Sequence, residues 1–291
     1  MKPMLKFKFI IVLLFILTAE YALAEETINW FVIQLPPSMV LDESGKKITG
    51  GAAGNVLLML QSELKEYSHN NVQMNWARFW NDVGHGKNIC NSILYKTPER
   101  VSAAEFSIPV AFILPVHMVL RKETYTAIGS PASISLIDIM KSKTLKGGLI
   151  NKRSYSEQID ALLKSNEKNT GISRHVVDVK RLVMMLMHKR FDYTLEYPPG
   201  IDFALMNMTK EEKISDLVMV PVKEIGSFYY VYIGCTKNEW GKNVINDLNA
   251  ALEKLRPSIK YKDALKEIYS GDSLKKANDI YKNHFVNSGG E

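Results

Sequence analysis

The sequence predicts an α/β protein with two lobes, each built on a mostly parallel sheet flanked by helices. Strand and helix patterns alternate along most of the 291 residues, which is typical of parallel sheets covered by helices. The chain after residue 24 is about 265 residues long, more than one domain usually holds, so we expect two hydrophobic cores. Because no repeat, linker or low-complexity tract separates the halves, short crossings should join the lobes.

The N-terminus has the pattern of an export signal. Three lysines among the first eight residues precede an apolar run at residues 9–17, and Ala22-Leu23-Ala24 matches the small-residue pattern that signal peptidase reads. We therefore expect residues 1–24 to be removed by cleavage near Ala24. A membrane anchor is the alternative, but the run is shorter than the ~20 apolar residues of a membrane-spanning helix.

The charge pattern argues against a nucleic-acid partner. The formal net charge is +6, and it falls to +4 when the three lysines and one glutamate of residues 1–24 are removed. Charges alternate in sign along most predicted helices instead of gathering as Lys and Arg stripes between aromatic residues. We interpret them as a solvated surface.

The N-terminal half predicts a strand, a helix and a second strand. Residues 28–33 have a strand pattern that ends at Pro36-Pro37, because proline cannot donate to a central ladder. A turn at residues 42–45 follows. Apolar residues at helical spacing predict a helix over 55–64, and a strand pattern returns at 72–76.

The same alternation continues through the C-terminal half. We predict strands at 148–150, 175–177 and 191–195, helices from Ser135, from Ser154 and over 179–188, and a helical tail at 240–269 and 274–285. Four Ser/Thr-x-x-acidic patterns, which cap helix N-termini, should mark helix starts: Ser135 with Asp138, Ser154 with Glu157, Thr209 with Glu212, and Thr236 with Glu239.

The stretch around Arg100 carries the clearest chemistry. Thr97 is a suitable N-cap and Pro98 suits the first helical position, so Arg100 falls in the first turn of a helix. A cation there opposes the helix dipole, but it is well placed to hold an anion such as a carboxylate in a forked pair. The alternative is a surface arginine paired with Glu99 or Glu105.

Residues 97–100 (TPER), with 106–109 (FSIP) after them and 86–88 (GKN) before them, resemble the family-3 extracellular solute-binding proteins. These are the polar-amino-acid receptors of ATP-binding cassette importers. The resemblance extends over most of the mature chain, through Pro36-Pro37, residues 190–192 (RFD) and the strand pattern at 229–234.

The resemblance implies a type II-like, two-lobed periplasmic binding protein fold. Lobe one would comprise residues 25–121 and 226–291, and lobe two residues 122–225. Ligand would lie in the cleft between the lobes, and the protein would be located in the periplasm.

The resemblance also implies the site. Arg100 would hold a ligand carboxylate, with Thr97 and Tyr95 beside it. The segment Arg153-Ser154-Tyr155 would supply backbone N–H groups and a hydroxyl from lobe two, although Ser154 could equally serve as a plain helix cap.

One departure from the family concerns the ligand ammonium. Where such receptors have an aspartate, this chain has Tyr197, preceded by Glu196. Strand alternation would direct only one of these two side chains into the cleft. Trp30 and Trp76 are further candidates for stacking on a ligand, with core packing as the alternative for each.

The two cysteines, Cys90 and Cys235, predict one disulfide in an oxidising compartment, with two free buried thiols as the alternative. The six histidines form no i,i+4 or Cys-paired set, so we expect no metal site. We find no nucleophile motif and expect no cofactor.

The sequence therefore predicts a monomeric, non-enzymatic solute-binding protein for a small carboxylate-bearing, amino-acid-like ligand, used for import or sensing. Its partner would be a membrane permease or a sensor protein. One alternative is a dehydratase-type enzyme on the same scaffold, with Glu196 as general acid or base. The other is a soluble sensory subunit of a membrane receptor.

Overall fold

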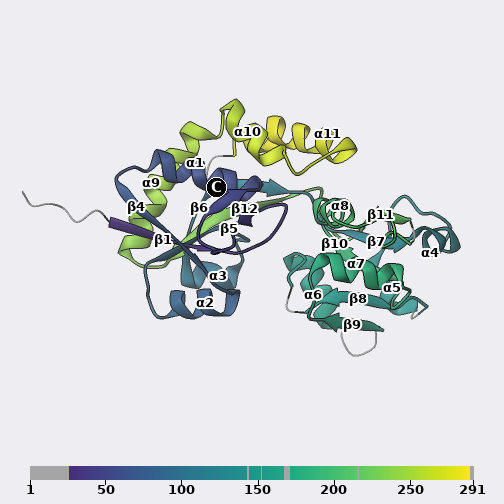
Figure 1. The fold of residues 1–291 in the computed structure, drawn as a ribbon. Coiled ribbons are helices and arrows are strands. Elements are labelled where there is room, and N and C mark those ends of the chain that lie inside the picture. The colour runs from purple at the N-terminus through teal and green to yellow at the C-terminus, as the bar shows by residue number, and fades with distance from the viewer. Residues whose placement is uncertain (1–25, 143, 152, 167–170, 215, 289–291) are drawn as a thin grey trace, which may run out of the picture.

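The computed structural model describes residues 26–142, 144–151, 153–166, 171–214 and 216–288. The predicted signal peptide, residues 1–24, lies outside this range. Two lobes stand side by side, each with a five-stranded sheet and flanking helices (Figure 1). The predicted α/β class and the two lobes are confirmed, whereas both sheets are mixed and not mostly parallel, because β12 and β7 run antiparallel to their neighbours.

Lobe one is built on a mixed sheet in the order β4-β1-β5-β12-β6. β4 and β5 run parallel to β1, whereas β12 runs antiparallel to both β5 and β6. A hairpin of β2 and β3 lies outside this sheet. The strands are β1 (Glu26–Val32), β2 (Val40–Leu41), β3 (Ile48–Gly50), β4 (Tyr67–Gln73), β5 (Ile89–Leu94), β6 (Ala104–Ile113) and β12 (Tyr229–Thr236).

The helices of lobe one come from both ends of the chain. Apolar faces of α1, α9 and α10 pack with β1, β6 and β12 into one core. In Figure 1, α10 and α11 run along the upper edge of lobe one toward lobe two. The helices are α1 (Ala52–Glu63), α2 (Trp76–Gly84), α3 (Pro98–Ala103), α9 (Glu239–Leu255), α10 (Ile259–Lys266) and α11 (Gly271–Ile280), followed by a π-helix at Tyr281–Phe285.

Lobe two is built on a second mixed sheet, in the order β11-β7-β10-β8-β9. β8 runs parallel to β9 and β10, and β7 runs antiparallel to β10 and β11. The strands are β7 (His117–Arg121), β8 (Gly147–Ile150), β9 (Ile172–His175), β10 (Tyr193–Glu196) and β11 (Leu217–Pro221). The helices are α4 (Lys122–Ala127), α5 (Leu136–Ser142), α6 (Glu157–Ser165), α7 (Val179–Met187) and α8 (Pro198–Met206).

Strand pairing places the first crossing between the lobes earlier than residues 121–122. Residues 117–121 form β7, which pairs with β10 and β11 of lobe two, so the chain has left lobe one between Ile113 and His117. On the way back, Val222 still bridges Ile134 of lobe two, and β12 joins lobe one from Tyr229.

Several predicted elements have different bounds; the strand predicted at 175–177, for example, is β9 and ends at His175. Two of the differences have a clear local cause. The strand predicted at 72–76 is β4, which ends at Gln73, because the Asn75 side chain accepts a hydrogen bond from the Arg78 N–H and starts α2. The helix predicted over 240–269 is two helices, since Pro257 interrupts it and Ser258 caps α10.

The four capping patterns have different outcomes. Ser135 accepts the Asp138 N–H at the start of α5. Thr209 and Glu212 exchange hydrogen bonds, but they close a turn rather than a helix. At the other two positions a polar residue two places later is the cap: Ser156 for α6 and Asn238 for α9.

Cys90 and Cys235 form a disulfide, so the predicted pairing is confirmed. The two residues lie directly opposite each other on the adjacent strands β5 and β12, and both are buried. Within the part of the chain that the structure describes, no helix is long and apolar enough to cross a membrane.

The disulfide should contribute strongly to stability, because it closes a loop of 145 residues in the unfolded chain. Reduction should lower the free energy of unfolding by about 2–4 kcal/mol, measured by urea denaturation with and without reductant. A Cys90→Ser/Cys235→Ser variant should be equally unstable in both conditions. Equal stability of the reduced and oxidised wild-type protein would contradict this role.

Candidate functional site

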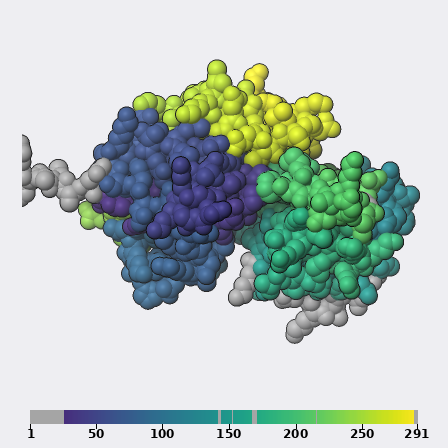
Figure 2. Space-filling view, in the orientation of Figure 1, coloured from purple at the N-terminus to yellow at the C-terminus, as the bar shows by residue number. Residues whose placement is uncertain are grey.

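A gap between the lobes opens at the lower edge of the molecule in Figure 2, between the blue part of lobe one and the teal part of lobe two. In Figure 1, α3 lies on one side of this gap and α6 on the other. Tyr95 directly follows β5, and Tyr197 directly follows β10. Their hydroxyl oxygens are 2.8 Å apart, so one hydrogen bond joins the two lobes here.

Burial shapes the chemistry of this tyrosine pair. It raises the pKa of Tyr95 to about 12 and the pKa of Tyr197 well above the ordinary value. Both phenols are therefore neutral at physiological pH. Tyr197 is also 3.3 Å from the Tyr155 carbonyl oxygen, to which its hydroxyl donates.

Arg100 lies in the first turn of α3, as the capping pattern predicts, on the lobe that carries Tyr95. The Thr97 hydroxyl accepts the Arg100 N–H at 3.3 Å, and Pro98 takes the first helical position. The guanidinium donates from Nη1 to the Tyr95 carbonyl oxygen at 3.1 Å and lies 5.3 Å from the centre of the Trp80 ring. Burial lowers the pKa of Arg100, which nonetheless stays charged.

Arg100 makes no ion pair with any residue that the structure describes, so the alternative pairing with Glu99 or Glu105 is not observed. The contacts with the Trp80 ring and the Tyr95 carbonyl oxygen position the guanidinium of Arg100 without neutralising its charge.

On the lobe-two side, Arg153 and Glu196 form an ion pair of 2.5 Å between Nη2 and Oε1. Glu196 is fully buried, and its Oε1 also accepts the Tyr197 N–H. Its Oε2 has no hydrogen-bond partner among the residues described. Burial raises the pKa of Glu196, while Arg153 opposes that shift. Sequence alternation left open whether Glu196 or Tyr197 faces the other lobe. Tyr197 is the one that contacts lobe one, and Glu196 pairs with Arg153 within lobe two.

Asp160 engages the predicted donors of residues 153–155. The Ser154 hydroxyl donates to one carboxylate oxygen of Asp160 at 2.5 Å, and the Tyr155 N–H donates to the other at 3.0 Å. Ser154 is not the helix cap either, since Ser156 has that role. The Tyr155 side chain is buried in the core of lobe two, where its hydroxyl accepts the Ile150 N–H.

The structure does not bring Trp30 to the site. Trp30 lies in the central part of lobe one, is fully buried, and donates through Nε1 to His69. The prediction that it stacks on a ligand is therefore wrong, because β1 is covered on the face that Trp30 occupies. Trp76, at the start of α2, packs edge-on against Phe31 with ring centres 4.8 Å apart, so core packing accounts for it.

Two residues beside the site were not predicted. Trp80 lies one helical turn after Trp76 on α2, a spacing that could have linked it to the same face. Asp160 carries no comparable signal, because its contacts with Ser154 and Tyr155 depend on how the loop before α6 folds back.

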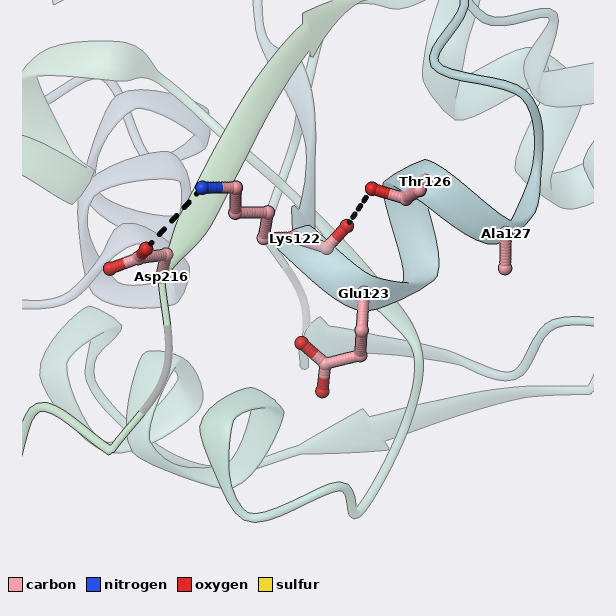
Figure 3. Close-up of a pocket in the computed structure, with 5 residues that line it drawn as sticks. All are labelled: Lys122, Glu123, Thr126, Ala127 and Asp216. Carbon is pink, nitrogen blue, oxygen red and sulfur yellow. Dashed lines mark hydrogen bonds and ion pairs between the residues drawn. The ribbon is translucent and has the colours of Figure 1, made fainter.

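A second hollow lies on lobe two, away from the gap. Lys122, Glu123, Thr126, Ala127 and Asp216 line it, and Lys122 pairs with Asp216 at 3.8 Å (Figure 3). Both partners of that pair are mostly exposed, so this hollow is an open surface feature. No group of three or more metal-ligating side chains occurs in the described ranges.

The sequence matches no protein-family model and no curated protein. Solved structures do match. A structure from glutathione import in Streptococcus mutans is 16% identical, with a TM-score of 0.61 over 86% of this chain and 95% of that one. An amino acid ABC transporter substrate-binding protein of Streptococcus pneumoniae, bound to L-arginine, is 15% identical, with a TM-score of 0.60 over 87% and 96%.

A histidine kinase sensor domain with similarity to periplasmic binding proteins is a further neighbour, at 13% identity and a TM-score of 0.63 over 84% of this chain and 96% of that one. At such identities the likeness is one of fold. The chain shares the two-lobed fold of these three structures.

The buried Glu196 should give stability a distinct pH dependence. Because burial raises the folded-state pKa of Glu196 above its ordinary value, the folded state holds the proton of Glu196 more tightly than the unfolded state does. The resulting stability is fully present at low pH and is lost as pH rises through the folded-state pKa. Relative to Glu196→Gln, the wild-type protein should therefore lose stability as the pH rises above the ordinary pKa of a glutamate, by up to about 1.4 kcal/mol per pH unit until the folded-state pKa is passed.

Urea denaturation at several pH values measures this difference, with the exposed Glu43→Gln as the matched control. A constant difference between the wild-type protein and Glu196→Gln across that range would contradict the assignment.

Proposed function

We propose that this chain is an exported, periplasmic solute-binding protein that captures a small carboxylate-bearing polar ligand between its lobes. The observation that carries the proposal is Arg100. Its guanidinium is partly buried at the edge of the interlobe gap, supported by Trp80 and the Tyr95 carbonyl, and forms no ion pair with the described residues.

A carboxylate is the ligand group that suits this arrangement. Removing a guanidinium from water is costly unless an anion and further hydrogen bonds compensate it. A carboxylate can accept two parallel N–H bonds from one arginine, which gives both energy and orientation. The Tyr95 carbonyl oxygen binds Nη1, and Nε and Nη2 of Arg100 have no hydrogen-bond partner among the described residues, so they could supply such a fork.

The two-lobed fold supplies the mechanism. A ligand held by Arg100 on lobe one and by groups of lobe two binds the closed arrangement better than the open one, and so shifts the population toward closure. The protein then acts as a monomer that presents the closed form to a membrane partner. The neighbours support either a permease or a sensor as that partner, since they include an importer component and a sensor domain.

An enzymatic role is the second candidate, because Glu196 is buried with a raised pKa and a carboxylate oxygen without a partner among the residues described. A dehydratase-type reaction would use Glu196 as general acid or base. Turnover of prephenate-like acids, lost in Glu196→Gln, would support this role, whereas saturable binding without turnover supports the solute-binding role.

Arg100→Ala should weaken ligand binding by about 100-fold or more, because it removes the group that pairs with the carboxylate. The melting temperature of the protein, scanned against amino acids, dicarboxylates, peptides and aromatic acids, reveals the ligand. At a hundredfold excess over Kd the ligand adds about 2.7 kcal/mol of stability. Arg100→Lys should restore only part of the binding, since an ammonium cannot form the fork.

Arg78→Ala is the matched control, because Arg78 is an exposed arginine on α2 of the same lobe. It should bind like the wild-type protein. Ligands that bind Arg100→Ala as tightly as the wild-type protein would refute the proposal.

A further inference from the structure

Away from the two crossings, the lobes touch each other only sparsely in the part of the chain that the structure describes. None of the described helices and strands of lobe one packs broadly against one of lobe two. Every ion pair between described residues also lies within a single lobe. Because no packed interface fixes the lobes, a single hydrogen bond between them can affect how far they separate.

The bond between the Tyr95 and Tyr197 hydroxyls, with 2.8 Å between the oxygens, is a contact of this kind. Each phenol has one proton to donate. The Tyr197 hydroxyl donates its proton to the Tyr155 carbonyl oxygen at 3.3 Å, within lobe two. Tyr95 must therefore be the donor in the bond between the lobes, and its proton loses this acceptor when the lobes separate.

Each phenol is positioned by its own lobe. The Tyr95 carbonyl oxygen accepts from Arg100, and the Tyr95 ring lies edge-on to Tyr229, with ring centres 6.3 Å apart. On lobe two, the Tyr197 N–H donates to the fully buried Glu196. Because both partners are ordered before they meet, their pairing costs less conformational entropy than pairing of two free side chains.

The tyrosine pair lies beside both crossings. Glu196, which precedes Tyr197, is opposite His117, the first residue of β7 after the first crossing. Tyr229, which contacts the Tyr95 ring, is the first residue of β12 after the second crossing. A displacement of about 1 Å is enough to lose an O–H···O hydrogen bond. A small rotation of the lobes about the crossings therefore breaks this one.

Away from the lower gap, the lobes are separated by a hollow. In Figure 1, α8 lies near the α10–α11 side of lobe one, and residues of α8 and of the loop between α10 and α11 line a cavity of about 640 Å³. At this cavity a hydrogen bond from Ser270 lowers the pKa of Asp202, against the larger effect of burial. Tyr197 is the N-cap residue of α8. The space beside α8 leaves room for rotation once the tyrosine pair separates.

We propose that the hydrogen bond between Tyr95 and Tyr197 is a latch between the lobes, which must break before the gap can widen. The latch requires no ligand, so it favours the arrangement described here whatever the cleft binds, and it goes beyond the proposed function. The net effect of a neutral hydrogen bond corresponds to about a 2- to 12-fold change in an equilibrium constant. The latch should favour the latched arrangement by that factor.

Pulsed electron paramagnetic resonance measures the separation of the lobes directly. Spin labels are attached at Ser102→Cys on α3 and Lys164→Cys on α6, which are exposed positions on the helices at the two sides of the gap. Cys90 and Cys235 are bonded to each other and do not react with the label. The labelled protein is unfolded in denaturant, dialysed and refolded before the measurement, which removes any bound solute.

In Tyr95→Phe the ratio of long to short distances between the labels should rise about 2- to 12-fold. Tyr197→Phe should raise it at least as much. The double variant should resemble Tyr197→Phe alone, because both substitutions remove the same hydrogen bond. Tyr125→Phe is the matched control, since the Tyr125 hydroxyl donates to Pro131 within lobe two, and it should leave the distances unchanged.

An unchanged ratio in Tyr95→Phe overturns the latch. A double variant whose change is the product of the two single changes overturns it as well, because independent effects multiply. Neither result depends on ligand binding by Arg100, so the latch can fail while the proposed function stands, and the reverse.

Discussion

The insertion of β12 between β5 and β6 is the constraint on which the rest of the structure depends. Lobe one cannot complete its sheet until the chain has built lobe two and returned, because the strand that fills the gap follows lobe two in the sequence. The position of the site depends on this pairing, because Tyr95 and the α3 cap at Thr97 follow β5, and β5 pairs with β12. The geometry of the Arg100 side of the cleft is therefore a consequence of a long-range pairing.

Different interactions position the side chains on the two sides of the gap. On lobe one, a short helix, an aromatic ring and a backbone carbonyl position Arg100. On lobe two, a buried ion pair positions Tyr197, because the carboxylate oxygen of Glu196 that binds Arg153 also accepts the Tyr197 N–H. A buried pair of this kind contributes little net stability compared with well-packed apolar residues, but breaking it by removing one partner is costly. The main effect of the pair between Arg153 and Glu196 is to fix the orientation of Tyr197.

Local signals in the sequence were sufficient for much of the fold and for one side of the site. The alternation of patterns predicts the α/β class, and Thr97-Pro98 predicts the start of α3, because caps depend on a few adjacent residues. The α6 cap was predicted at Ser154 but lies at Ser156, whose hydroxyl accepts the Ile159 N–H. The sequence pattern alone does not show which serine the loop before α6 brings to the helix start. Trp30 was misassigned because burial depends on which strands and helices cover β1.

β7 could not be placed in lobe two, since the sequence pattern of an apolar strand does not show which sheet the strand joins.

The disulfide has a topological consequence beyond stability. Cys90 and Cys235 close a covalent ring that contains the end of β5, both crossings and the whole of lobe two. A protease that cuts once within lobe two would open this ring without separating the two fragments, so the nicked protein would migrate as one species until reductant is added. Lobe two can thus be cut while its pieces remain attached to the lobe that carries Arg100.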